Sequence, residues 1–201
     1  MRFYLIRHGQ TEWNAQKRVM GRQDIPLDSI GEQQITELAQ TLAAFPIQTI
    51  VSSPQLRAQQ TAQAISIVKN VPVHTDTRIS ELDFPRWQGK ALHEIQDDQV
   101  YIDRKKDFFT FRHPEVENFE SLMGRVSAFI SEVGKKDHHV AVVTHLDVVR
   151  AMLIHILGTS PDSFFQFRIQ NASCTILTKE NDRWVMELMN FTKTPLNGLN
   201  I

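Results

Sequence analysis

Residues 139–145, HVAVVTH, carry the strongest signal for a buried strand in this chain. Residues 2–6, RFYLI, form a second run that is apolar on both faces. Strands of this kind are typical of parallel sheets, because helices cover both of their faces. The two runs therefore favour a sheet that is buried between layers of helices.

Helical patterns alternate with predicted strands through most of the sequence. The expected helices cover residues 30–45, 54–68, 119–133 and 148–157, and the further expected strands cover 49–53, 71–75, 173–179 and 183–191. This alternation predicts an α/β fold, a three-layer α/β/α sandwich with a mainly parallel central sheet.

Several residues mark the expected ends of these elements. Ser29 begins a Ser-x-x-Glu capping box, and Pro54 suits the first turn of the helix that follows the 49–53 strand. Gly158 is the expected C-cap residue of the helix over 148–157. Asn181 and Asp182 predict the turn of a closing hairpin.

Residues 78–116 are irregular, charged and aromatic, unlike the rest of the chain. We expect this segment to lie over one end of the sheet as a cap-like insertion. There is no internal repeat and no linker rich in glycine, serine or proline. The sequence therefore predicts a single domain over residues 1–201.

The charge balance bears on possible partners. The formal net charge of −1 gives no support for binding to nucleic acid or to an anionic membrane. The single cysteine, Cys174, excludes an internal disulfide and suits a reducing compartment. With no signal peptide or membrane-spanning run expected, the prediction is a cytoplasmic protein. The sequence leaves the oligomeric state open, a homodimer included.

Several common catalytic motifs are absent from the sequence. It contains no phosphate-binding P-loop, no dinucleotide fingerprint and no Gly-x-Ser-x-Gly nucleophile elbow. Cys174 lacks the arginine six residues later that a cysteine-based phosphatase needs, and no spacing of metal ligands stands out. We therefore expect neither a cofactor nor a metal.

Polar residues follow each predicted parallel strand, where open α/β sheets bind their ligands. They are Arg7 and His8, Arg57, Glu81, and His145. Arginine forks match phosphate oxygens, and a neutral histidine has a nucleophilic ring nitrogen. A carboxyl group nearby can protonate a leaving oxygen. Together they predict a metal-free site for phosphoryl transfer through a phosphohistidine.

Five ordered segments resemble the histidine phosphatase superfamily, also called the phosphoglycerate mutase-like family. They are RHGQTEWN (7–14), GRQDIPLDSIGEQQI (21–35), SSPQLRAQQTA (52–62), ELDFPRWQG (81–89) and VTHLDVVR (143–150). The segments NASCTIL and MNFTKTPL are similar to the closing hairpin of the family. The resemblance covers nearly the whole chain and implies a phosphoglycerate mutase-like fold with a short cap.

The resemblance also implies roles for individual residues. His8 would be the phosphorylated nucleophile, and Glu81 would be the proton donor and later the base that activates water. The implied phosphate ligands are Arg7, Arg57, His145 and Asn14. Gly9 would allow a tight turn after the strand. The lower-ranked substrate contacts are Arg22, Glu120 and Asn171.

The sequence departs from the family pattern at three places. Leu146 and Asp147 stand where glycine usually follows the second histidine, and Asp147 could cap the helix or point toward the phosphate. Pro85 replaces a common glycine in the acid loop, and VENFESL replaces a glycine-rich stretch. Asp83 is a second candidate for the proton donor.

The leading hypothesis is a phosphomonoesterase that hydrolyses a small phosphorylated metabolite. A phosphoglycerate mutase is the first alternative, although the short interval between Arg57 and Glu81 favours hydrolysis. A catalytically weak regulatory protein that binds a phospholigand is the second, and the substitution at Leu146 and Asp147 keeps it open.

Overall fold

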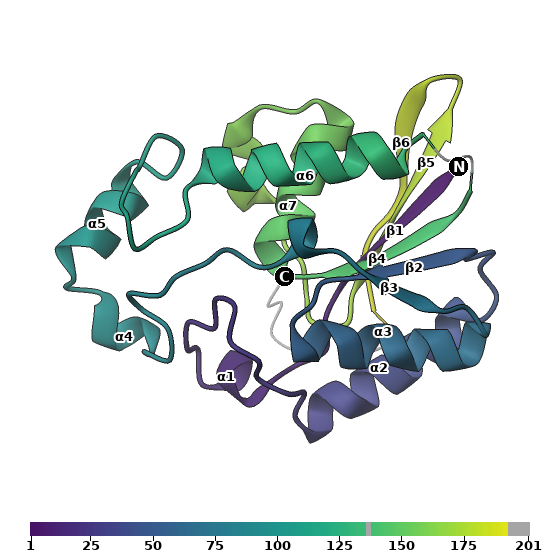
Figure 1. Ribbon diagram of the computed structural model, residues 1–201, viewed down its shortest axis with the longest axis horizontal. Helices are drawn as coiled ribbons and strands as arrows, with labels where there is room; N and C mark the ends of the chain where they lie inside the picture. The colour runs from purple at the N-terminus through teal and green to yellow at the C-terminus, as the bar shows by residue number, and fades with distance from the viewer. Residues whose placement is uncertain (136–137, 193–201) are drawn as a thin grey trace, which may run out of the picture.

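The central element of the computed structural model, which describes residues 1–135 and 138–192, is a six-stranded sheet (Figure 1). The strands have the order β3-β2-β4-β1-β5-β6. Their bounds are β1 Arg2–Arg7, β2 Thr49–Ser52, β3 Val73–Thr75, β4 Val140–Thr144, β5 Cys174–Glu180 and β6 Arg183–Phe191. The first four strands are parallel, whereas β5 and β6 form an antiparallel hairpin against β1. The predicted mainly parallel sheet is confirmed.

Helices cover both faces of this sheet. The α-helices are α1 Glu12–Ala15, α2 Ser29–Leu42, α3 Leu56–Lys69, α4 Leu92–Ile95, α5 Gln99–Lys106, α6 Phe119–Val133 and α7 Leu146–Leu157, with 3-10 helices η1 Thr77–Ile79 and η2 Pro161–Gln166. Figure 1 shows α2 and α3 on one side of the sheet and α6 and α7 on the other. This arrangement is the predicted three-layer sandwich.

The two-residue period of a strand explains why β1 is apolar on both of its faces. Phe3 and Leu5 of β1 pack in the core beneath α6 and α7, whereas Tyr4 and Ile6 pack in the core beneath α2 and α3. Side chains alternate between the faces of a strand, so both faces must be apolar when both are covered.

The register of the sheet brings two polar segments together. Arg7, at the end of β1, pairs with Thr144, at the end of β4. The next residues along the two strands are His8 and His145. Because the strands are parallel, both histidines emerge at the same edge of the sheet.

Some expected element ends are wrong in detail. Asp28 rather than Ser29 caps α2, because its carboxylate accepts a hydrogen bond from Gly31 N at 2.7 Å. Pro54 lies before α3, whose N-cap is Gln55. Helix α7 begins two residues before the expected start, directly after its N-cap His145.

The other end signals are confirmed. Gly158 closes α7 in the left-handed conformation with φ +63°. Asn181 and Asp182 have φ +46° and +62° between β5 and β6, as a tight hairpin turn requires. Of the segment MNFTKTPL, residues 193–196 lie outside the described residues.

The segment 78–116 contains α4 and α5 and a small cluster of buried side chains, Trp87, Ile95 and Val116. In Figure 1 these helices lie on the side toward which β1 and β4 end. That the segment is a cap-like insertion in a single domain of residues 1–201 stays a prediction. Within the described residues, no helix is both long and apolar enough to cross a membrane.

Gly31 is the point at which α2 crosses the loop that follows His8. A Cβ atom at Gly31 would lie 2.0 Å from the carbonyl oxygen of Gln10. Gly124 in α6 is the opposite case, since a Cβ there would have no atom within 4 Å. The two helical glycines therefore differ sharply in the space available to a methyl group.

We expect Gly31→Ala to lower the free energy of unfolding by about 1–3 kcal/mol, because the loop must shift to make room. Gly124→Ala should raise it by about 0.5–1 kcal/mol, because alanine favours the helix. Urea unfolding of both variants measures the difference. Equal effects of the two substitutions would contradict the close packing of α2 on the loop.

Candidate active site

His8 lies at the tip of β1 with its ring buried and only 2% of the residue exposed. Its backbone N–H donates to Thr144 O at 2.9 Å, which ties the tip of β1 to β4. The ring Nδ1 lies 2.7 Å from Gly9 O. A carbonyl oxygen only accepts, so Nδ1 carries the proton and Nε2 carries the lone pair.

The guanidinium of Arg57 is completely buried beside this lone pair. Its Nε donates to His8 Nε2 at 3.2 Å, while its two Nη atoms donate to Gln23 O at 2.7 Å and Gly21 O at 2.9 Å. The loop at residues 21–23 thus orients the arginine. Burial lowers the pKa of Arg57 to about 10, so it stays charged at neutral pH.

Burial and the positive charges of Arg57 and Arg7 lower the pKa of His8 well below its ordinary value. The ring is therefore neutral at pH 7, and Nε2 keeps the lone pair that a nucleophile needs. The expected neutral histidine follows from this environment.

His145 caps the N-terminus of α7, and its ring centroid lies 5.2 Å from that of His8. Its Nε2 lies 2.7 Å from Ser53 Oγ, and the Ser53 hydroxyl also makes a short hydrogen bond to Gln55 Oε1. Because an amide oxygen only accepts, Ser53 donates to Gln55 and accepts from His145 Nε2. His145 Nδ1 is buried and has no hydrogen-bond partner within the described residues.

Arg7 ends β1 and brings a second guanidinium to this group. Its Nη1 donates to Ile169 O at 2.7 Å. Its Nε is buried without a hydrogen-bond partner in the part of the chain that the structure describes. Burial lowers the pKa of Arg7 to about 10, against the opposing effect of the nearby Glu81 carboxylate.

The turn after His8 is held by two asparagines. Asn171 Nδ2 donates to the carbonyls of His8 and Gly9 and to Asn14 Oδ1, at 3.1–3.3 Å. Asn14 Oδ1 also accepts from Thr11 N at 3.1 Å, closing the capping box of α1. Both residues therefore lie beside the turn that follows His8, and their contact with a bound phosphate or substrate stays a prediction.

Gly9 is needed for a different reason from the expected one. Gly9 is not among the residues with positive φ, so no glycine-specific turn exists there. Instead, a Cβ atom would lie 2.8 Å from Ile35 Cγ2 and 2.9 Å from Gly31 O. Close packing of α2 excludes any larger side chain at Gly9.

Glu81 follows η1 and lies close enough to the arginines to interact with their charges. Its Oε1 accepts from Leu82 N at 3.0 Å. Burial, followed by repulsion from Asp147, raises the pKa of Glu81 to about 7, against smaller opposing effects that include the charge of Arg57. This carboxyl group is thus partly protonated at neutral pH, as a proton donor requires.

Asp83, the second candidate for proton donor, lies in a more open position. Its side chain is 36% exposed, and its Oδ2 lies 4.0 Å from Arg22 Nη1. The geometry therefore favours Glu81 over Asp83.

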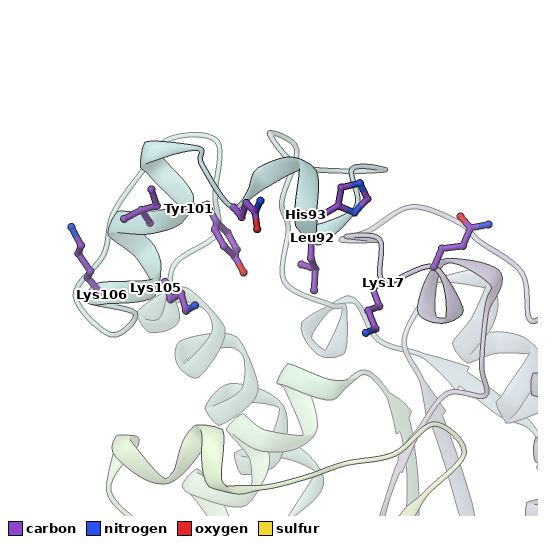
Figure 2. A pocket seen from close by; sticks show the side chains of 9 residues that line it. Lys17, Leu92, His93, Tyr101, Lys105 and Lys106 are labelled. Atoms are coloured by element: carbon purple, nitrogen blue, oxygen red, sulfur yellow. The ribbon is translucent and has the colours of Figure 1, made fainter. Parts of the chain in front are cut away.

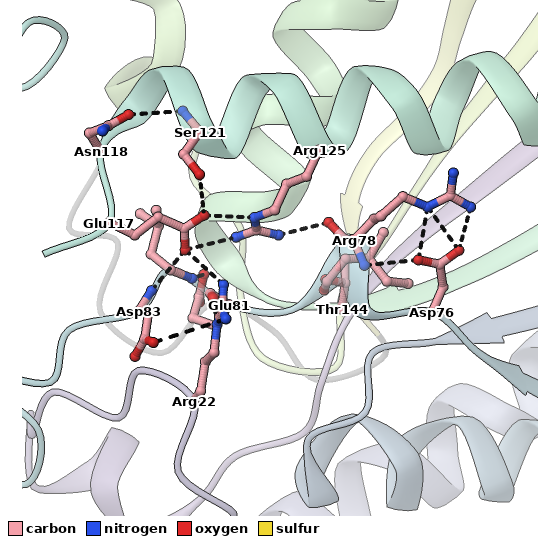
Figure 3. A network of polar contacts seen from close by, with 12 residues as sticks. Arg22, Asp76, Arg78, Glu81, Asp83, Glu117, Asn118, Ser121, Arg125 and Thr144 are labelled. Carbon is pink, nitrogen blue, oxygen red and sulfur yellow. Dashed lines mark hydrogen bonds and ion pairs between the residues drawn. The ribbon is translucent and has the colours of Figure 1, made fainter.

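A network centred on Glu117 holds the segment that carries Glu81 (Figure 3). Glu117 accepts from Arg125 Nε at 2.8 Å and from Asp83 N at 3.0 Å. Arg125 also donates to Arg78 O at 2.7 Å. Backbone atoms on both sides of Glu81 are therefore fixed by one partly buried ion pair. Sequence analysis did not identify Glu117 or Arg125, because nothing in VENFESL distinguishes its two glutamates.

The two remaining predicted substrate contacts, Arg22 and Glu120, lie in different surroundings. Arg22 donates through Nε to Glu81 O at 3.3 Å and through Nη2 to Glu117 Oε2 at 3.1 Å, so it supports the acid loop. Glu120 instead pairs with Arg112 at 2.6 Å, and its side chain is 79% exposed. The predicted substrate contact of Glu120 gains no support from this outward position.

Asp147 is not the cap of α7, because it lies in the first turn after the N-cap His145. Its Oδ1 accepts from Arg150 Nη1 at 3.1 Å. The charge is nevertheless close enough to raise the pKa of Glu81. The residue that replaces a family glycine thus acts on the candidate acid.

A cavity of about 920 Å³ lies apart from His8 and His145, between the end of α1 and helices α4 and α5. Figure 2 shows Lys17, Leu92, Tyr101 and Lys105 around it. None of the grouped residues His8, Arg57, Glu81 and His145 lines this space. Its size alone therefore does not make it the site. Across the described ranges, no group of three His, Cys, Asp or Glu side chains could hold a metal ion.

Residues 3–192 match the model of the histidine phosphatase superfamily (branch 1). The chain belongs to this superfamily. The resemblance expected from the five sequence segments is therefore confirmed over nearly the whole chain.

Other members of the histidine phosphatase superfamily agree in sequence and fold. The chain is 32% identical to phosphoserine phosphatase 1 of Hydrogenobacter thermophilus, over 96% of this chain and 93% of that one. It is 27% identical to a protein of Enterobacter named "Probable phosphoglycerate mutase", over 92% and 88%. A mycobacterial glucosyl-3-phosphoglycerate phosphatase, solved with VO3, is 26% identical with a TM-score of 0.85, over 94% and 98%.

Two glutamates three residues apart allow a matched test of the acid loop. We expect Glu117→Gln to lower kcat about 10–100-fold, because Glu81 loses its fixed position. Glu120→Gln should leave kcat nearly unchanged, since this side chain faces solvent. Phosphatase assays of both variants, with circular dichroism to confirm folding, measure the contrast. Equal losses, or a loss only in Glu120→Gln, would contradict the arrangement.

Proposed function

We propose that the protein is a phosphomonoesterase that needs no metal and hydrolyses a small phosphorylated metabolite through a phosphohistidine on His8. The observation that carries the proposal is a pair of buried nitrogens without partners, Arg7 Nε and His145 Nδ1, beside the lone pair of His8. Buried polar groups are nearly always hydrogen-bonded, so unpaired ones point to a missing ligand. An oxyanion such as a phosphoryl group accepts from Arg7 Nε, and it accepts from His145 Nδ1 once that ring has taken up a proton.

In the first step, His8 Nε2 attacks the phosphorus and forms the P–N bond. The P–O bond to the leaving group breaks, and Glu81 gives its proton to the leaving oxygen. Arg57 must turn its Nε–H from His8 to a phosphoryl oxygen, which frees the lone pair for attack. The site is then a phosphohistidine beside a Glu81 carboxylate.

In the second step, the Glu81 carboxylate takes a proton from water while the water oxygen attacks the phosphorus. The P–N bond breaks, phosphate leaves, and His8 and protonated Glu81 are restored. A single carboxyl group with a pKa of about 7 suits both directions of transfer, because neither protonation state is strongly disfavoured at neutral pH.

Fixed positive charge is the main stabilising effect in this scheme. Arg7 and Arg57 stay charged in a buried setting where their interaction with phosphoryl oxygens is stronger than in water. The N-terminus of α7 behind His145 adds its dipole. His145 takes up a proton when a dianion binds, so that Nδ1 can donate to it.

Two wider parts of the proposal rest on the sequence alone. They are that the segment 78–116 acts as a cap over the site, and that the protein is cytoplasmic. Phosphoglycerate mutase activity is the competing outcome, since one relative carries that name. Transfer between 3- and 2-phosphoglycerate that outpaces phosphate release would favour the mutase.

Replacing the nucleophile tests the proposal directly. We expect wild-type protein treated with chelator to release phosphate from p-nitrophenyl phosphate and to form an acid-labile phosphate adduct on His8. His8→Ala should lose both, whereas His155→Ala, on the exposed end of α7, should keep both. Phosphate assays and mass spectrometry of quenched protein give the readouts. Activity that survives His8→Ala, or that requires a metal, would contradict the mechanism.

The pH dependence tests the role of Glu81. Because the acid must be protonated in the first step, kcat/KM for glycerol 2-phosphate should fall as pH rises through about 7. Removing the charge of Asp147 makes the Glu81 carboxylate easier to form, so Asp147→Asn should move this alkaline limb to lower pH. Asp97→Asn, an exposed control, should leave it in place. An alkaline limb that does not move in Asp147→Asn would assign it to another group.

A further inference from the structure

A second cavity, of about 330 Å³, opens directly beside Asp147 and Leu146 at the start of α7. Its walls are mostly apolar and aromatic, and Phe84, Trp87, Phe108 and Phe165 contribute to them. Three charged residues also line it, namely Arg104, Asp147 and Arg150. Pockets with apolar walls and a few converging polar groups are typical of small-molecule sites. None of His8, Arg57, Glu81 and His145 lines this cavity either, but Asp147 does, and its charge raises the pKa of Glu81. The cavity therefore lies on the side of the site that holds the candidate acid.

Arg104 of α5 is the most unusual of these residues. Its guanidinium carbon lies 4.8 Å from the ring centroid of Phe84 and 4.6 Å from that of Phe108, so two aromatic rings contact the group. In the described part of the chain, it has no hydrogen bond and no ion pair. Burial lowers the pKa of Arg104. Arg104 is partly buried, and the charges of Asp147 and Glu81 act on it without making a hydrogen bond to it. A cation in this setting is stabilised further when an anion binds it directly.

The N–H donors of Arg104 are available to a ligand. The rings of Phe84 and Phe108 contact the guanidinium carbon, and no described residue accepts a hydrogen bond from the group. A carboxylate matches that fork in bidentate geometry. Arg104 therefore has the properties of a receptor for a carboxylate on the leaving group.

Asp147 gives the same cavity an opposite charge. Its Oδ1 is held by Arg150 Nη1 at 3.1 Å, and its Oδ2 has no hydrogen bond within the described residues. A free carboxylate oxygen attracts an ammonium group and repels a carboxylate. Asp147 thus favours leaving groups that carry an ammonium group over leaving groups that are purely anionic.

We propose that this cavity selects a phosphorylated α-amino acid, with Arg104 binding the substrate carboxylate and Asp147 binding its ammonium group. The inference rests on the proposed phosphatase function and adds the substrate class. Leu146 and Asp147, which replace glycine after the second histidine, then serve substrate choice rather than weaken the site. Arg104 and Asp147 are specificity-determining residues that contact the leaving group, and Arg150 positions Asp147.

Four phosphomonoesters test the carboxylate and the ammonium group of the substrate separately. O-phosphoserine carries both a carboxylate and an ammonium, 3-phosphoglycerate only the carboxylate, O-phosphoethanolamine only the ammonium, and glycerol 2-phosphate neither. With wild-type protein, kcat/KM for O-phosphoserine should exceed each of the other three by at least ~10-fold, because only this substrate pairs both receptors.

Two variants should then give crossed patterns. Arg104→Gln should lower kcat/KM at least ~10-fold for the two carboxylate-bearing substrates and leave O-phosphoethanolamine and glycerol 2-phosphate nearly unchanged. Asp147→Asn should lower kcat/KM for the two ammonium-bearing substrates relative to kcat/KM for the other two. Ratios between substrates at one pH cancel the effect of Asp147 on Glu81, because that effect is common to all four. Lys106→Gln, which removes a charge from the exposed side of α5, should leave every ratio unchanged.

The outcomes separate this inference from the proposed function. If none of the four esters and no p-nitrophenyl phosphate is hydrolysed, the phosphatase function itself fails. If they are hydrolysed without preference for O-phosphoserine, the function stands and the substrate class is wrong. An Arg104→Gln variant that slows all four substrates equally would assign Arg104 to packing against the phenylalanines, and would overturn its role in selection.

Discussion

The burial of the Arg57 guanidinium against His8 is the interaction on which the rest of this site depends. A completely buried arginine needs hydrogen-bond partners, and here two hydrogen bonds go to the carbonyls of Gly21 and Gln23. The third goes to His8 Nε2. The loop 21–23, helix α3 and strand β1 are therefore fixed relative to one another by one side chain. Binding of a phosphoryl group exchanges only this third hydrogen bond.

The same environment sets the protonation of both partners in the proposed chemistry. Burial disfavours a charge on either group, which lowers the pKa of His8 and raises that of Glu81. The arginines strengthen the effect on His8, whereas Asp147 strengthens the effect on Glu81. The result is a neutral nucleophile beside a carboxyl group near its midpoint at pH 7. Two opposite shifts thus arise from one buried setting with separated charges.

Sequence predicted the layers and the grouped residues because both follow from local patterns. Alternating apolar strands and helices define the sandwich, and parallel strands bring Arg7, His8 and His145 to one edge. The sequence did not give the reason for Gly9, since the obstruction comes from α2, which is distant along the chain. The sequence pattern also pointed to Glu120 and missed Glu117. Which of the two glutamates near the start of α6 turns inward depends on its partners Arg125 and Asp83, and these are not visible in the local sequence. Long-range packing decides such details.

The residues that distinguish this protein from the family pattern are also the ones that local patterns describe least well. Asp147 was expected as a helix cap or a phosphate neighbour, yet its charge acts on Glu81 and faces the aromatic cavity. Arg104 had no motif around it, and its significance arises from two phenylalanines that reach it from different segments. Chemistry shared with the superfamily is thus visible in sequence, whereas selectivity becomes visible only in three dimensions.

The most direct test of the central claim is nitrogen-15 NMR of the histidine side chains in the free protein. We expect His8 to be neutral at pH 7 and still neutral at about pH 6, with its proton on Nδ1 and none on Nε2. A protonated, positively charged His8 ring at about pH 6, or a neutral ring with its proton on Nε2, would contradict it.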